Sequence, residues 1–252
     1  MTGKRNRVAA YYNNISAVYD THFRREHDLI DRREKEIFER EIGGIEGERV
    51  LDFGCGTGRF ALYLLRKNPR QVLGVDISPG MIAAAAAAAK TDHPAIAFRV
   101  YNPQQRQTPF NPHAPFSLIT CLEVIEYQPD PQEFFTVVQR NLKPGGRLFF
   151  DFINRANPMA RLKARTNKHW IKNGVQLYTA AGMRRLCRAN NIAVKGMHGV
   201  HMLLLPKSLL SKRAAVQRAA LRLDRLLDKL PALKYLLAYR IVVVAARNEP
   251  DA

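Results

Sequence analysis

Apolar residues in this chain of 252 residues alternate between short runs typical of buried strands and longer stretches with helical spacing. Residues 49–53 form a β-branched and aromatic run, and helical periodicity resumes at 59–66, beyond three glycines. Further strand-like runs cover residues 71–76, 95–100, 115–121, 147–153, 192–196 and 240–247. Strands that alternate with helices in this way predict an α/β fold with a mostly parallel sheet.

Three stretches lie outside this alternation. Residues 1–48 precede the first strand and have helical patterns at 11–23 and 26–42, so we expect helices that do not join the sheet. Residues 157–175 are basic and have no clear periodicity, which predicts an irregular connection. Between the last two strands, residues 203–237 carry leucines at helical spacing with Lys and Arg on the other sides, which predicts a basic amphipathic helix.

The three glycines between the first strand and the next helix suggest a ligand site. Gly54, Gly56 and Gly58 have no Cβ, so the loop can turn tightly and a ligand can lie against bare backbone at the start of a helix. Asp76 ends the second strand at the same edge, where a carboxylate can accept both hydroxyls of a ribose. In the alternative interpretation, the glycines form only a tight turn and Asp76 caps the next helix.

A dinucleotide-binding enzyme would also have a glycine loop and an acid here, but its fingerprint needs Gly or Ala where this chain has Arg59. The G-x-G-x-G spacing, with Asp52 two residues ahead, instead resembles motif I of the class I S-adenosylmethionine-dependent methyltransferases. Residues 114–135, APFSLITCLEVIEYQPDPQEFF, and 141–154, NLKPGGRLFFDFIN, resemble two later segments of the same family, in the expected order.

The resemblance implies a Rossmann-like fold with a seven-stranded, mostly parallel sheet and an antiparallel last strand. It also implies one methyltransferase domain over residues 1–252. Within it we expect a helical lid at 1–48, a cofactor-binding core at 49–205, a basic helical insertion at 206–238, and the last strand and tail at 239–252. The segment YYNNISAVYDTHF resembles the lid helix of ubiquinone and menaquinone biosynthesis methyltransferases, in which a Tyr closes over the cofactor or lines the substrate cavity.

The resemblance also implies a set of residues that bind S-adenosylmethionine. They are Tyr12, Tyr19, Asp52, Phe53, Gly54, Cys55, Gly56, Thr57, Gly58, Asp76, Ile77, Ser78, Met81, Asn102, Cys121 and Leu122. Asn102 departs from the family, which often has Asp at this position. The side chains of Glu123, Glu126 and Tyr127 are expected to face the methyl-transfer cavity.

The catalytic residue stays open. Many relatives have His where Tyr127 stands, and a Tyr cannot act as a base at neutral pH without a strong shift of its pKa. Further candidate bases are His22, His27, His198 and His201, and none stands above the others.

We therefore expect methyl transfer to a small, lipophilic or natural-product acceptor, most simply at oxygen. A nucleic-acid methyltransferase and a noncatalytic binding protein with the same fold are the alternatives. The D/N-P-P-Y/F tetrapeptide of enzymes that methylate exocyclic base amines is absent, and Thr120 stands where RNA cytosine-C5 enzymes have the Pro before their Cys.

The net charge of +18 is concentrated in the second part of the chain. Residues 1–150 hold 20 Lys and Arg against 17 Asp and Glu, whereas residues 151–252 hold 20 against 5. Such an excess attracts nucleic acid, anionic lipid or acidic substrates. Residues 207–237 could therefore lie on an anionic membrane, although packing against the domain explains the same apolar stripe.

The composition shows no sign of a metal site or a membrane-spanning segment. The three cysteines, Cys55, Cys121 and Cys187, are widely spaced and odd in number, which suits a reducing compartment, and no metal-ligand spacing appears. No apolar run is long enough to span a membrane, and the N-terminus lacks a signal-peptide pattern. We expect a cytoplasmic protein, and its oligomeric state is left open.

Overall fold

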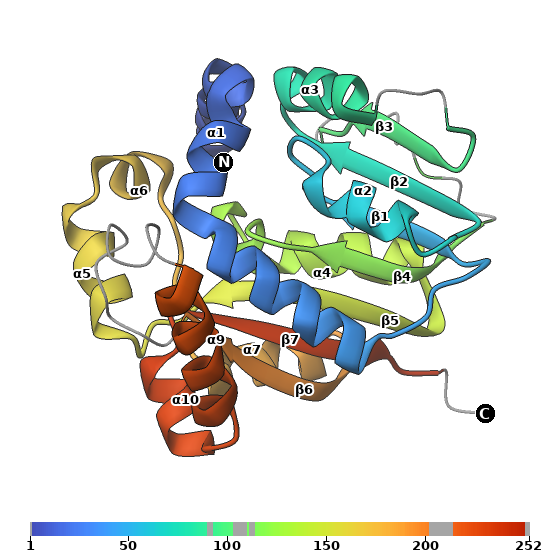
Figure 1. The fold of residues 1–252 in the computed structure, drawn as a ribbon. Coiled ribbons are helices and arrows are strands. Elements are labelled where there is room, and N and C mark those ends of the chain that lie inside the picture. The colour runs from blue at the N-terminus through green and yellow to red at the C-terminus, as the bar shows by residue number, and fades with distance from the viewer. Residues whose placement is uncertain (1, 90–92, 103–109, 111–113, 202–213, 250–252) are drawn as a thin grey trace.

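The computed structural model describes residues 2–89, 93–102, 110, 114–201 and 214–249, and its centre is a seven-stranded sheet (Figure 1). The strand order is β3-β2-β1-β4-β5-β7-β6. The strands are β1 (Arg49–Phe53), β2 (Gln71–Asp76), β3 (Ile96–Val100), β4 (Phe116–Cys121), β5 (Leu142–Ile153), β6 (Ile192–Val200) and β7 (Arg240–Arg247). β7 runs antiparallel to both of its neighbours, and the pairs from β3 to β5 are parallel. The predicted fold class is confirmed.

Successive side chains of the central strands enter two different cores, because a strand sends alternate residues to opposite faces. Val50 belongs to the core under helices α1, α2 and α3, whereas Leu51 belongs to the core under α4 and α7. Phe149 and Phe150 divide in the same way. These helices are α1 (Thr2–Glu41), α2 (Arg59–Leu65), α3 (Pro79–Ala89), α4 (Pro131–Asn141) and α7 (Ala180–Ala189). The sheet is therefore covered on both faces (Figure 1).

The strand order reverses next to β1, since the chain adds β2 on one side of it and β4 on the other. In an open parallel sheet, the loops that leave two such strands separate and leave a crevice at their carboxyl ends. Here those ends are Phe53 and Cys121, which lead into the glycine loop and into the segment with Glu123. The topology thus brings two of the sequence motifs to one edge.

The N-terminal region is one continuous helix rather than two separate patterns. Helix α1 covers Thr2–Glu41 without a break. Its N-terminal half contacts α3, where Asn13 Oδ1 accepts hydrogen bonds from Gly80 N at 2.6 Å and from Ser78 Oγ at 3.1 Å. Its C-terminal half packs into the sheet through Ile37 and Phe38, which are fully buried.

The prediction that residues 157–175 are irregular is wrong, because they form helices α5 (Pro158–Thr166) and α6 (Lys168–Asn173). Each helix has an Asn cap: Asn157 accepts from Ala160 N at 2.9 Å, and Asn167 accepts from Trp170 N at 3.0 Å. Asn followed by Pro is a helix-start signal. The many basic residues of this stretch leave little apolar periodicity, and the helices were therefore not predicted.

Two strands are longer than expected, and both lengthen through an irregularity. β5 begins at Leu142 rather than at 147, because the turn Lys143-Pro144-Gly145-Gly146 sits within it as a register shift against β4. β6 continues to Val200 past a register shift between Val194 and Gly196. The alternation of side chains is interrupted where the strand pairing shifts, so a strand predicted from that alternation ends too early.

The described residues before the last strand form helices α9 (Ala214–Asp228) and α10 (Pro231–Leu237), separated where Pro231 prevents continuation. Residues 202–213 of the predicted insertion, including Leu209 and Lys212, lie outside the described residues. The boundaries of lid, core and insertion stay a prediction.

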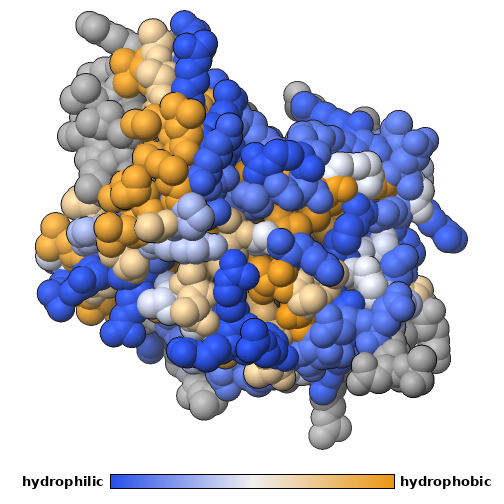
Figure 2. All heavy atoms as spheres, turned by 90° about the horizontal axis from the view of Figure 1, so that it is seen from below, coloured by the Kyte–Doolittle hydropathy of each residue, from blue (hydrophilic) through white to orange (hydrophobic). Residues whose placement is uncertain are grey.

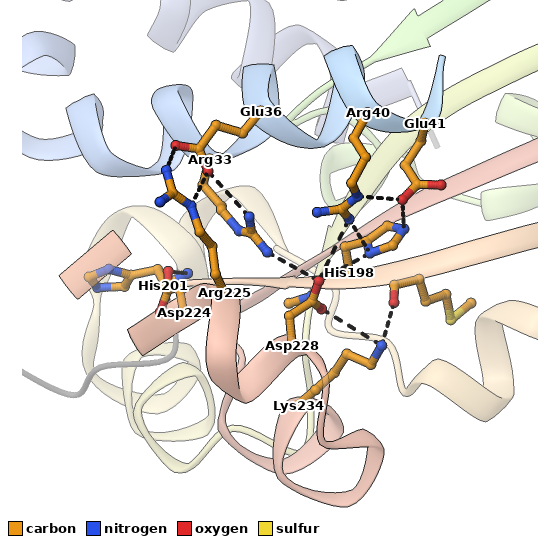
Figure 3. A network of polar contacts seen from close by, with 12 residues as sticks. Arg33, Glu36, Arg40, Glu41, His198, His201, Asp224, Arg225, Asp228 and Lys234 are labelled. Atoms are coloured by element: carbon orange, nitrogen blue, oxygen red, sulfur yellow. Dashed lines mark hydrogen bonds and ion pairs between the residues drawn. The ribbon is translucent and has the colours of Figure 1, made fainter. Parts of the chain in front are cut away.

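Polar contacts around Asp228 hold α9 against α1 and β6 (Figure 3). Asp228 Oδ2 accepts from Arg33 Nη2 and lies against His198 Nδ1, both at 3.1 Å, and Oδ1 accepts from Gly199 N at 2.8 Å. Nearby, Glu36 accepts two hydrogen bonds from Arg225 of α9. Helix α9 is thus anchored to the C-terminal half of α1. The N-terminal half of α1 lies at the edge of the sheet where the cavity is found.

Candidate active site

The three loop glycines have three different physical roles. All have positive φ, namely 77° at Gly54, 53° at Gly56 and 80° at Gly58. A Cβ on Gly54 would collide with the side chain of Val124, and a Cβ on Gly58 would lie 2.9 Å from Phe98 Cζ. A Cβ on Gly56 would meet no atom within 4 Å. Gly56 is therefore the glycine whose backbone faces open space.

Asp76 ties this loop to the end of β2. Its Oδ2 accepts from Gly56 N at 3.0 Å, and its Oδ1 accepts from Ser78 N at 2.8 Å. Burial raises the pKa of Asp76, and these backbone donors act in the opposite direction because they favour the carboxylate. Each oxygen keeps a second lone pair, so the group can still accept from a ligand.

A cavity with about 820 Å³ of empty volume, part of it open to solvent, lies at this edge. Nine predicted cofactor residues line it, namely Tyr12, Tyr19, Phe53, Gly54, Gly56, Asp76, Ile77, Met81 and Leu122. A smaller hollow of about 420 Å³ shares Tyr19, Gly54, Gly56 and Leu122 with it and adds Asp52, Cys55 and Thr57. The structure therefore brings most of the predicted set together around two adjoining spaces.

The four remaining residues of the set line neither space. Ser78 caps α3, accepting from Met81 N at 3.2 Å, and Gly58 packs on Phe98. Cys121 is fully buried in the core. Asn102 lines neither space, whereas its neighbour Tyr101 lines the larger one.

Aromatic rings from α1 form the roof of the larger cavity. Tyr12 lies 6.1 Å from Tyr19 and 5.7 Å from Tyr127, measured between ring centroids and in edge-on arrangements. Burial raises the pKa of all three phenols. They stay protonated at neutral pH, so they can donate hydrogen bonds into the cavity but cannot serve as bases.

His169 lies behind Tyr127, on helix α6. Its Nε2 is 3.4 Å from the Tyr127 hydroxyl, and its Nδ1 is 2.9 Å from Asn173 Nδ2. Burial lowers the pKa of His169, so the imidazole is favoured in its neutral form. Its ring also lies against Tyr11, at 3.8 Å between centroids.

Of the predicted catalytic candidates, Glu123 and Tyr127 line the cavity, whereas Glu126 does not. Glu126 Oε1 accepts from Arg240 Nη2 at 2.8 Å, and Arg240 also pairs with Asp151 through Nε. Asp151 Oδ1 in turn accepts from Glu123 N at 2.7 Å. Burial raises the pKa of Glu126 and of Asp151, and the Arg240 guanidinium opposes this shift.

This buried cluster positions the backbone of Glu123, which has a φ of 59°. Sequence reasoning missed Asp151 and Arg240. The available signal was an Asp within the apolar run LFFDFI of β5 and an Arg at the start of β7, because charged residues are rarely buried unless they are paired.

The two candidate histidines whose side chains the structure describes do not line the cavity. His198 belongs to the network around Asp228, and His201 N donates to Asp224 Oδ2 at 2.9 Å (Figure 3). The side chains of His22 and His27 lie outside the described part of the structure. Within the described residues, no group of three or more His, Cys, Asp or Glu side chains could hold a metal ion.

Exposed leucines cover the outer side of α9 and α10. The fractional exposure reaches 59% at Leu226 and 51% at Leu236. Leu223, Leu230 and Leu233 belong to the same surface, which we call the leucine face. Seen from below, apolar residues gather in a band bordered by hydrophilic ones (Figure 2). No helix among the described residues is long and apolar enough to cross a membrane.

Comparison with known proteins agrees with this geometry. A family model described as a methyltransferase domain matches residues 21–195. The ubiquinone biosynthesis O-methyltransferase of Acinetobacter baumannii (strain AYE) is 35% identical over 164 residues, which are 62% of this chain and 65% of that protein. This chain thus spans slightly less than two thirds of that relative's length.

Two solved structures share the fold. The complex between the Haloferax volcanii Trm112 methyltransferase activator and a putative methyltransferase matches with a TM-score of 0.66 and 20% identity, over 94% of this chain and 98% of the matched chain. An S-adenosylmethionine-dependent methyltransferase from Mesorhizobium loti matches with a TM-score of 0.61 and 20% identity, over 85% and 98%. The chain belongs to the methyltransferase-domain family, and its fold is that of S-adenosylmethionine-dependent methyltransferases.

Proposed function

We propose that this protein transfers a methyl group from S-adenosylmethionine to an oxygen atom of a small, lipophilic acceptor. The observation that carries the proposal is the cavity at the switch point, where the open backbone of Gly56 and the carboxylate of Asp76 lie under a roof of tyrosines. The similarity to ubiquinone biosynthesis O-methyltransferases supports the choice of acceptor class and of oxygen.

The residues present fit the cofactor. Gly56 leaves room where a Cβ would stand, Asp76 keeps lone pairs for ribose hydroxyls, and Ile77 and Met81 offer apolar surface for an adenine ring. When bound, S-adenosylmethionine supplies an electrophilic methyl group on a positively charged sulfur. The Glu123 carboxylate, which lines both spaces, lies where it can favour that charge.

The cavity suits an apolar acceptor with a single polar group. Val8, Val124 and the tyrosine rings line it, and Tyr12, Tyr19 and Tyr127 can donate to an acceptor oxygen. Methyl transfer is an in-line displacement, so alignment of the two reactants and exclusion of water provide most of the assistance. The roof formed by α1 performs both tasks in this proposal, and Glu123 is the group we assign next to the reacting atoms.

The test is calorimetry with S-adenosylmethionine followed by a screen for methylated product. We expect saturable binding and transfer of a labelled methyl group into the organic extract of a cell lysate. Absence of any heat and of any thermal shift at millimolar cofactor would instead favour a noncatalytic protein with this fold. Label that appears only in RNA would favour the nucleic-acid alternative.

We also propose that the protein is cytoplasmic and that the leucine face, with the segment 207–237, rests on an anionic membrane. The face carries exposed leucines, and Arg218 and Arg222 on α9 and Lys229 just after it are exposed basic residues. Apolar surface bordered by cations matches the interface of a bilayer with acidic lipids. Such a location suits a lipophilic acceptor.

A further inference from the structure

A second, open hollow lies outside the cofactor cavity, between helix α5 and the chain that leads into α7. It is lined by Arg155, Ala156, Arg161, Ala164, Arg165, Gln176, Leu177 and Thr179. Three of these eight residues are arginines, and all three are exposed. We call this the arginine hollow.

The backbone presents these arginines in a fixed arrangement. Arg161 and Arg165 are one helical turn apart on α5 and therefore lie on the same side of that helix. Arg155 approaches from the loop before α5, where its amide donates to Tyr178 O at 2.8 Å. Asn157 then caps the helix. The three cationic side chains thus start from ordered positions around one space.

The three arginines have no carboxylate partner among the residues that the structure describes. Elsewhere in the molecule, Arg33, Arg225 and Arg240 each form ion pairs with Asp or Glu. Like charges one helical turn apart repel each other, and a third cation beside them adds to the repulsion. An anion in the hollow would reduce this repulsion further than solvent screening does.

The chemistry of the lining suits a phosphoryl group, because its charge of about −2 and its three oxygens can be shared by several guanidinium groups. Guanidinium groups present planar pairs of N–H donors that match the oxygens of phosphate, and several arginines together can contact one such group. The neighbouring Thr179 Oγ accepts from Gly182 N at 3.0 Å, so its own hydrogen can point elsewhere. Leu177 and Ala164 add apolar surface beside the charges.

We propose that the arginine hollow is a binding site for the phosphoryl group of a phosphate-bearing ligand, either a lipid headgroup or a soluble phosphate ester. It lies beside the cofactor cavity rather than within it. Gln176, in its wall, donates from Nε2 to Gln128 O at 3.0 Å, and Gln128 lines the cavity. The two spaces have no lining residue in common, so the site does not depend on the proposed cofactor contacts.

Pyrophosphate binding, measured by calorimetry on the full chain, tests the proposal. The variant carries Arg155→Gln, Arg161→Gln and Arg165→Gln together. The matched control carries Arg70→Gln, Arg185→Gln and Arg188→Gln, which removes the same charge from exposed arginines elsewhere. We expect affinity to fall at least about tenfold in the first variant and less than about twofold in the control. Equal losses in both, or no binding to the wild-type protein, would overturn the proposal.

Vesicles distinguish the two sources of the phosphoryl group. Phosphatidylcholine vesicles with and without phosphatidic acid are used with the same variants. Loss of both pyrophosphate and phosphatidic-acid binding in the hollow variant assigns a lipid headgroup, and loss of pyrophosphate binding alone assigns a soluble ester. Calorimetry with S-adenosylmethionine is expected to be unchanged in both variants, so failure of this proposal is separable from failure of the proposed function.

Discussion

Arg33 of helix α1 donates a hydrogen bond to Asp228 at the end of α9, with 3.1 Å between Nη2 and Oδ2. The Arg33 side chain is 1% exposed and that of Asp228 is 8% exposed. Two segments almost 200 residues apart are thus joined by a charge pair that is largely removed from water. Loss of Asp228 leaves the buried Arg33 with Glu36 as its remaining carboxylate partner among the described residues, at 3.3 Å, and such a loss is costly.

Asp228→Ala is therefore expected to lower the free energy of unfolding by about 3 kcal/mol, measured by urea denaturation at pH 7. Glu46→Ala, at an exposed site, is the control and is expected to have almost no effect. The partners of Asp228 hold its pKa below the usual range, so its contribution is present above the unfolded pKa and is lost as the pH falls through the folded pKa. The difference between wild type and variant should shrink below about pH 4. A pH-independent difference would contradict this account.

Burial raises the pKa of Asp52 to about 7, although Thr120 Oγ donates a hydrogen bond to its carboxylate. An acid with a raised folded pKa costs stability as the pH rises from the unfolded pKa through the folded one. We compare the free energy of unfolding of Asp52→Asn with that of the wild type. The difference is expected to favour the variant by about 2 kcal/mol more at pH 8 than at pH 5. Unfolding curves at both pH values measure this difference, and equal effects at the two would refute it.

Loss of the acceptor in Asp76→Ala is expected to weaken S-adenosylmethionine binding by about 2 kcal/mol, or roughly 30-fold. Calorimetry measures the affinity. Because Asp76 also accepts from Gly56 N and Ser78 N, the melting temperature of the variant must be recorded beside it. An unchanged affinity in the folded variant would show that the ribose lies elsewhere.

Gly56 and Gly58 form a matched pair that separates ligand approach from packing. Gly56→Ala places a methyl group in open space, so we expect a stability loss of only about 1 kcal/mol from the positive φ, together with a cofactor affinity at least tenfold weaker. In Gly58→Ala the new methyl group also collides with Phe98, and the loss in the free energy of unfolding is expected to reach about 3 kcal/mol. Urea denaturation and calorimetry on both variants check this; the reverse order of stabilities would contradict it.

Vesicle co-sedimentation tests the leucine face. The double substitution Leu226→Ser and Leu233→Ser removes apolar surface at positions that are already exposed, so folding should be retained. We expect binding to phosphatidylglycerol vesicles to fall about tenfold or more. Ile171→Ser, an exposed apolar residue on α6, is the control. Equal partitioning of the wild-type protein to neutral and anionic vesicles would exclude the electrostatic part of the proposal.

The parts of the fold that sequence predicted best are those determined by local pattern. β1, β2 and β7 begin and end where the β-branched runs do, since each run is buried and bounded by turn residues or charge. The glycine loop and Asp76 could also be predicted, because the turn and the carboxylate at the strand end depend on residues close together in the sequence.

Features that depend on distant pairing could not be predicted in the same way. The contacts of Arg240 with Glu126 and Asp151 exist only because β7 inserts antiparallel between β5 and β6. The position of His169 behind Tyr127 likewise depends on how α6 folds back. Neither pairing has a signature at a fixed spacing along the chain.

Helix α1 is one unbroken helix that connects the cavity with the contacts around Asp228. Its 40 residues rise about 60 Å and contain no proline, so the helix has no built-in hinge. Tyr12 and Tyr19 cover the cavity near one end, and Arg33 and Arg40 meet Asp228 near the other. Asn13, next to Tyr12, also accepts a hydrogen bond from Gly80 N, so the helix that covers the cavity is held by polar contacts near both of its ends.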